Sequence, residues 1–165
     1  MSGGTPDASP GPSPGARSAR VVVLLIGLLV GLAGCGLVPS RPAADDWVAA
    51  ARTALDDAAS EVATVRLVLE QEQQDRLPPS YAVVVAARSE EAAGTAADSI
   101  TAQQPPDSKR REYDAVAAAL GDAAALVAEA RIALVRHDAA AYPGLAERLS
   151  QLQTRLAQLD TSMAR

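Results

Sequence analysis

The chain has 165 residues, with 15 basic and 20 acidic side chains and a net charge of −5 at neutral pH. This acidic balance argues against a broad nucleic-acid-binding surface. One cysteine and one histidine, Cys35 and His137, leave no internal disulfide and no set of inward ligands for a haem, di-iron or zinc centre, so we expect neither a cofactor nor a metal.

The first segment has the organisation of a secretory signal peptide. A polar leader that contains Arg17 and Arg20 precedes an apolar run over residues 21–33, and small residues follow before Cys35. A basic region, an apolar region and a small-residue cleavage site in this order are the parts of an export signal. The sequence therefore predicts that the protein leaves the cytoplasm.

Leu32, Ala33, Gly34 and Cys35 resemble the lipobox of bacterial lipoproteins, which reads Leu-(Ala/Ser)-(Gly/Ala)-Cys, at all four positions. The resemblance covers only the signal region, and the Ala, Gly, Pro and Arg bias of the chain is similar to that of actinobacterial lipoproteins. It implies cleavage after Gly34 and a diacylglycerol thioether on Cys35. The mature protein would then be lipid-anchored to the cell membrane and face its extracytoplasmic side.

Two other interpretations of the same segment are open. Apolar residues continue to Val38, so the run approaches the length of an uncleaved membrane anchor. Cys35 could also be a buried structural cysteine. We favour the lipoprotein interpretation, because two small residues before a cysteine are required for cleavage of the signal peptide, whereas an uncleaved membrane anchor does not require them. The expected division is a signal peptide at 1–34, a lipidated cysteine and tether at 35–42, and a folded domain at 43–163.

The folded domain is predicted to be helical throughout. Apolar and small residues recur at spacings of three and four in four segments: 43–74, a segment that starts with Ser80 as its N-cap, one that starts at Asp107 or Ser108, and one that starts near Pro143. Their expected inward residues are, in order, Val48, Ala51, Leu55, Ala58, Val62, Val65 and Leu69; Tyr81, Val84, Val85, Ala92, Ala96 and Ile100; Tyr113, Val116, Leu120, Ala123, Val127, Ala130 and Leu134; and Leu145, Leu149, Leu152, Leu156, Leu159 and Met163.

These four helices, joined by short proline-marked turns, predict an all-α fold, an antiparallel up-down-up-down four-helix bundle. The leucine stripe of the last helix could instead form a zipper between two copies, but a bundle needs an inner seam from each helix. Several charges are expected in pairs four residues apart along one helix, namely Arg52–Asp56, Arg66–Glu70, Glu72–Arg76 and Arg110–Asp114.

No reaction can be assigned from the sequence, and we expect no enzyme activity. The chain has no Gly-rich phosphate loop and no Gly-x-Ser-x-Gly motif, and its paired acids are adjacent, so their side chains diverge around a helix. The expected function is a protein-interaction or accessory module at the cell envelope, with an envelope protein as partner. The alternative is a binding protein for a small or lipidic envelope ligand.

Two candidate sites follow from the helix order. Lys109, Arg110 and Arg111 are expected at the end nearest the anchor, where they either contact anionic headgroups or form a solvated loop. A second group is expected together at the opposite end, as a partner or ligand site or as a cap on the core: Arg76, Tyr81, His137 and Tyr142.

Overall fold

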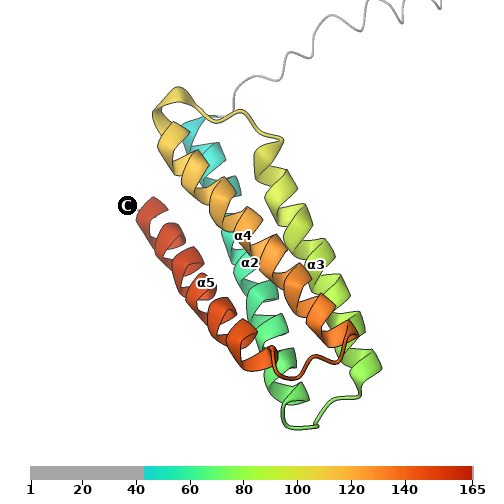
Figure 1. Cartoon of the computed structure of the whole chain (residues 1–165). Helices are drawn as coiled ribbons and strands as arrows, with labels where there is room; N and C mark the ends of the chain where they lie inside the picture. Colours follow the sequence, from blue (N-terminus) through green and yellow to red (C-terminus); the bar gives the residue numbers. More distant parts are fainter. Residues whose placement is uncertain (1–42, 165) are drawn as a thin grey trace, which may run out of the picture. The chain divides into compact units, whose positions relative to one another are not determined.

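The computed structural model describes residues 43–164, which form four α-helices and one short 3-10 helix (Figure 1). The α-helices are α2 (Ala44–Glu72), α3 (Pro79–Thr101), α4 (Arg110–Val135) and α5 (Tyr142–Met163), and the 3-10 helix η1 (Asp107–Lys109) leads into α4. Successive helices run in opposite directions, so the predicted up-down-up-down bundle is confirmed. The predicted signal peptide and tether, residues 1–42, lie outside the described residues.

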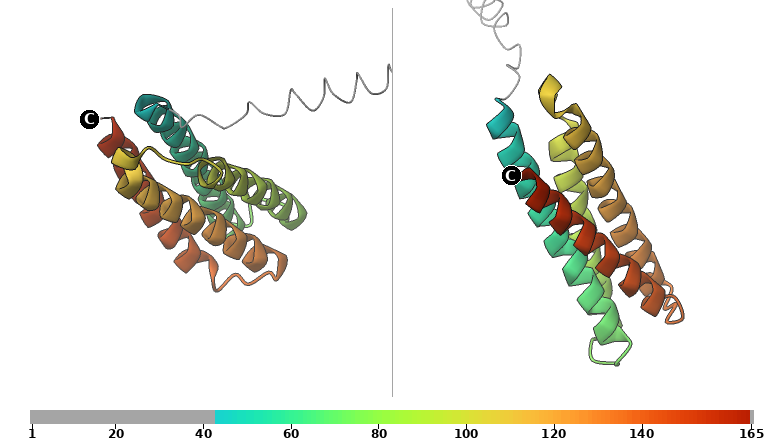
Figure 2. Two further views of the ribbon diagram at one scale, coloured as in Figure 1. Left: turned by 90° about the horizontal axis from the view of Figure 1, so that it is seen from above. Right: turned by 90° about the vertical axis from the view of Figure 1, so that its left-hand side faces the viewer.

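Helix α2 is the central element of the packing. It contacts α3, α4 and α5, and α4 in turn contacts α3 and α5. The helices are therefore arranged as a four-cornered bundle in which α2 and α4 form the short diagonal (Figure 2). Alanines at many inward positions, including Ala51, Ala58, Ala123 and Ala130, allow this close diagonal approach.

The inward faces of α2, α4 and α5 follow the predicted spacing. In α2 all the predicted residues are buried except Val48, which packs partly buried against the core, and in α4 only Tyr113 is partly buried. In α5 the residues Leu145, Leu149, Leu152 and Leu156 are buried inside the bundle, so this stripe is the inner seam of the fold. It is not available as a zipper between two copies.

The predicted face of α3 is right for Ala96 and Ile100, which are buried, but wrong at the start of the helix. Tyr81 and Val84 are exposed, with 57% and 49% of their surface accessible, and the residues that face the core are Ala82, Ala86, Ser89, Ala93, Ala96 and Ile100. The predicted Ser80 cap is also wrong, because Pro78 holds the N-cap position and Pro79 is the first residue of the helix. Small side chains on the core face let α3 lie close to its neighbours. Of its three valines, Val83 and Val85 pack partly buried against the core, and Val84 is left at the surface.

Trp47, which the inward pattern omitted, is the largest side chain of the core. It is fully buried in the second turn of α2, and its ring lies 6.4 Å from the ring of Tyr113, with an angle of 46° between the two planes. Its indole Nε1–H is buried without a hydrogen-bond partner. The two rings join the beginning of α2 to the beginning of α4 and close the core at that end.

Ion pairs on the bundle surface mostly connect different helices. Arg52 of α2 donates to Asp160 of α5 (2.7 Å), and Glu90 of α3 accepts from Arg131 of α4. Two further pairs connect α4 to α5: Glu129–Arg148 and Asp122–Arg155, each at 2.7 Å. Of the four predicted pairs within a helix, only Arg66–Glu70 forms among residues 43–164, also at 2.7 Å. Each such exposed pair contributes little, about 0–1 kcal/mol.

Candidate functional site

We call the end of the bundle opposite the start of α2 the distal pole. It contains the turns 73–78 and 136–141, which lie at the same end of the bundle (Figure 1). In the first turn, the Arg76 N–H donates to the Gln71 carbonyl oxygen (3.0 Å) and the Asp75 N–H donates to that of Glu72 (3.1 Å). This pair of bonds is the Schellman motif, which requires a left-handed residue after the helix, and Asp75 has a φ of 53°.

The end of α4 repeats the same arrangement. The His137 N–H donates to the Leu134 carbonyl oxygen (3.1 Å), the Asp138 N–H donates to that of Ala133 (3.0 Å), and His137 has a φ of 53°. His137 is thus the left-handed residue that ends α4, a position usually held by glycine. The backbone of His137 therefore terminates α4, while its side chain is exposed to solvent.

The four residues predicted for this pole all lie there, but in different surroundings. Arg76, Tyr81 and His137 are exposed, whereas Tyr142 is only 3% exposed and begins α5 against the core. Burial raises the pKa of the Tyr142 phenol, and the nearby carboxylates of Glu72 and Asp138 raise it further. Tyr142 is therefore placed as a cap on the last core layer, and Tyr81 is the tyrosine that remains available at the surface.

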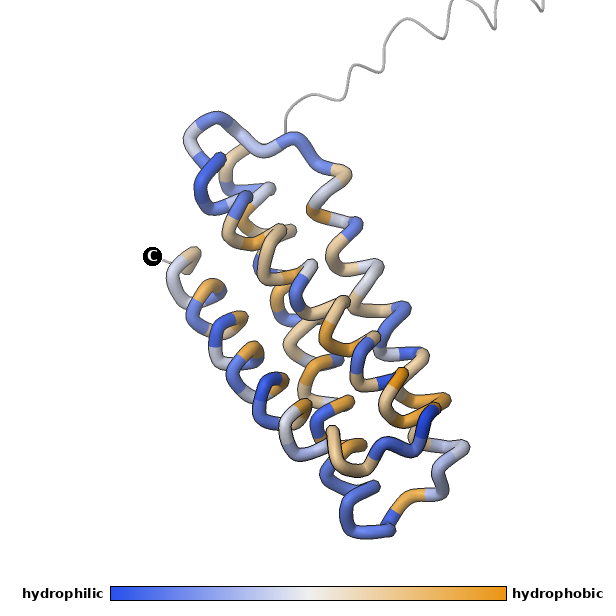
Figure 3. Tube along the Cα trace, viewed as in Figure 1, coloured by the Kyte–Doolittle hydropathy of each residue, from blue (hydrophilic) through white to orange (hydrophobic). Residues whose placement is uncertain are grey.

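The large apolar side chains left at the surface gather in the distal half of the bundle. Among residues 43–164 these are Leu67, Tyr81, Val84, Ile132 and Val135, each between 40% and 57% exposed. Hydrophobic positions are visible along the distal turns of α3 and α4 (Figure 3). The sequence does contain a signal for this, since the run Val83–Val84–Val85 cannot turn all three side chains inward from one helix.

Ile132 and Val135 belong to a longer pattern on α4, which we call the outer stripe. It recurs at spacings of three and four on the side of α4 that faces solvent, and consists of Asp114, Ala118, Gly121, Ala125, Ala128, Ile132 and Val135. All are exposed except Ala128, which is half-buried. Helix α4 therefore has a small and apolar outer seam in addition to its buried one.

Helix α3 adds a parallel pattern beside it. Its solvent side carries Val84, Ala87, Glu91, Gly94 and Asp98. Because α3 and α4 are antiparallel and Glu90 bonds to Arg131, the turns before Glu90 lie beside the turn after Arg131. Val84 and Ala87 are thus brought to the same level as Ile132 and Val135.

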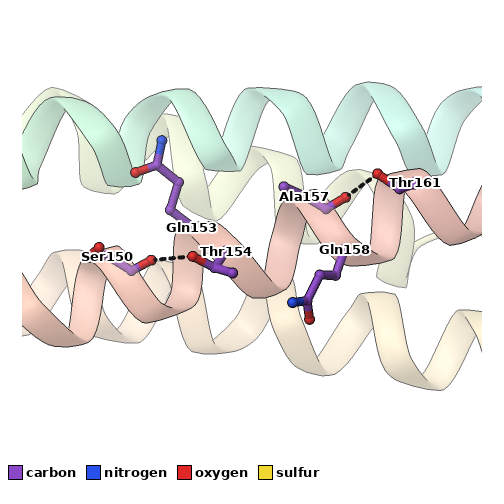
Figure 4. A pocket seen from close by; sticks show the side chains of 6 residues that line it. All are labelled: Ser150, Gln153, Thr154, Ala157, Gln158 and Thr161. Carbon is purple, nitrogen blue, oxygen red and sulfur yellow. Dashed lines mark hydrogen bonds between the residues drawn. The ribbon is translucent and has the colours of Figure 1, made fainter.

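Two hollows of the surface are candidate ligand sites, and the larger of the two lacks converging polar groups. One of about 730 Å³ lies along a single face of α5, lined by Ser150, Gln153, Thr154, Ala157, Gln158 and Thr161 (Figure 4). The hydroxyls of Thr154 and Thr161 donate to carbonyl oxygens of their own helix, at 3.1 and 2.9 Å, and Gln153 and Gln158 point away from each other. Its polar groups therefore do not converge on one point, as a ligand site requires.

A second hollow of about 310 Å³ lies between the start of α4 and the end of α5, where Arg111 and Glu112 stand above Val116, Leu159 and Met163. It is also open to solvent. Lys109 donates to Glu112 (3.3 Å). The pKa of Glu112 is lowered, first because its own backbone N–H stabilises the carboxylate and then because of Lys109.

The end of the bundle at which α2 begins, the proximal pole, contains the predicted basic group. Arg110 and Arg111 are exposed, and Lys109 is half-buried beside Glu112. Six acidic residues share this pole with the three basic ones: Asp45, Asp46, Asp98, Asp107, Glu112 and Asp114. An excess of acids weakens attraction to anionic headgroups, so contact of Lys109, Arg110 and Arg111 with lipid stays a prediction with less electrostatic support than the three residues alone suggest.

Comparison with known proteins assigns the chain to no family. No family model matches the chain, and neither the curated proteins nor the solved structures contain a significant match. Within residues 43–164 there is no cluster of three or more His, Cys, Asp or Glu side chains that could hold a metal ion. None of the helices formed by these residues has the length and apolar character needed to cross a bilayer.

Proposed function

We propose that the protein is a lipid-anchored module at the extracytoplasmic face of the cell membrane, which binds another envelope protein through the distal half of its helical bundle. Its anchor is the diacylglycerol on Cys35, supported by the lipobox Leu32-Ala33-Gly34-Cys35. A diacylated cysteine provides two hydrocarbon chains, and two chains give stable attachment where one gives only marginal binding.

One observation carries the interaction role. Four of the five exposed large apolar side chains of residues 43–164, namely Tyr81, Val84, Ile132 and Val135, lie in the distal turns of the neighbouring helices α3 and α4. Exposed apolar residues gathered on one part of a soluble domain mark an interaction surface, whereas scattered ones need no explanation. The alternative role of binding a small or lipidic ligand has less support, because the hollows along α5 and beside Arg111 are open to solvent and do not enclose a ligand.

The anchor is tested by Cys35→Ala, with Ser40→Ala as a matched control just downstream. We expect Cys35→Ala to abolish incorporation of labelled lipid and to leave the precursor unprocessed, because the thioether cannot form. The Ser40→Ala protein should be labelled and processed like the parent. A Cys35→Ala protein that is still cleaved and recovered in the membrane fraction would exclude the lipoprotein.

A further inference from the structure

We draw no further inference here: the strongest candidate, the exposed apolar patch formed by Tyr81, Val84, Ile132 and Val135 on the distal turns of α3 and α4, carries none, because exposed charges of both signs lie on the same sides of these helices and nothing in the structure shows what covers the patch.

Discussion

Replacing both helical glycines by alanine should stabilise the bundle. Gly94 and Gly121 lie inside α3 and α4, and an added Cβ at either position meets no atom within 4 Å. Each Gly→Ala change then gains the helix-propensity difference, about 0.8–1.0 kcal/mol. The two sites are on different helices and share no side-chain neighbour, so their effects add to about 1.6–2.0 kcal/mol in the free energy of unfolding.

Urea unfolding of the purified mature protein, followed by circular dichroism, measures this gain. For a domain of this size, with an m-value of about 1.5–2 kcal/mol per M, the midpoint should rise by about 1 M in the double variant. Gly144→Ala, in the first turn of α5, is the control and should change the midpoint less, because helix ends fray. An unchanged or lower midpoint for the double variant would refute the reasoning, since it would mean that the bundle itself needs these glycines.

Three further predictions follow from the packing. Trp47→Ala should lower the free energy of unfolding in urea by about 3–5 kcal/mol, because it empties the fully buried site beside Tyr113; a loss below about 1 kcal/mol would show that this end of the core is loosely packed. His137→Gly should raise the free energy of unfolding by about 1 kcal/mol, because glycine adopts the left-handed conformation at φ 53° without strain, and a lower melting temperature would contradict this. The raised pKa of Tyr142 means that the folded state favours the neutral phenol, so stability should fall as the pH rises past about 10, where the unfolded tyrosine ionises; an unfolding midpoint with the same pH dependence in Tyr142→Phe would count against it.

Much of the fold could be predicted because leucine and valine mark one face unambiguously. The stripe from Leu55 to Leu69 and the four buried leucines of α5 have few other large apolar residues on the remaining sides of their helices, so their spacing alone defines the core face. The face of α3 could not be found in this way. Its core residues are mostly alanines, which occur on all sides of the helix. Hydrophobicity therefore predicted that the valines face the core, although Val84 is at the surface.

The position of Arg76, Tyr81, His137 and Tyr142 at one pole could be predicted, but their exposure could not. Helix order alone brings the ends of α2 and α4 to one pole, which is why Arg76, Tyr81, His137 and Tyr142 were expected together. Whether each side chain is exposed depends on the rotation of its helix, and spacing does not fix this near a helix end. The outer stripe could not be predicted from the sequence. Alanine and glycine occur on all sides of the helices in this Ala-rich chain, so only the burial of each residue shows which side of α4 faces solvent.

The partners of charged side chains could not be predicted from spacing along one helix either. Spacing along one helix predicted Arg52 with Asp56, but in the bundle Arg52 reaches Asp160 of α5, because a neighbouring helix offers a carboxylate at 2.7 Å. Contacts between helices depend on their register, and no local pattern in the sequence encodes that register.

The central claim, that a lipidated Cys35 holds the protein at the membrane, is tested most directly by mass spectrometry of the N-terminal peptide of the protein extracted from membranes. The account predicts that the mature chain begins at Cys35 and carries the added mass of a diacylglycerol. Peptides from residues 1–34 in the membrane-bound protein, or an unmodified Cys35, would contradict it.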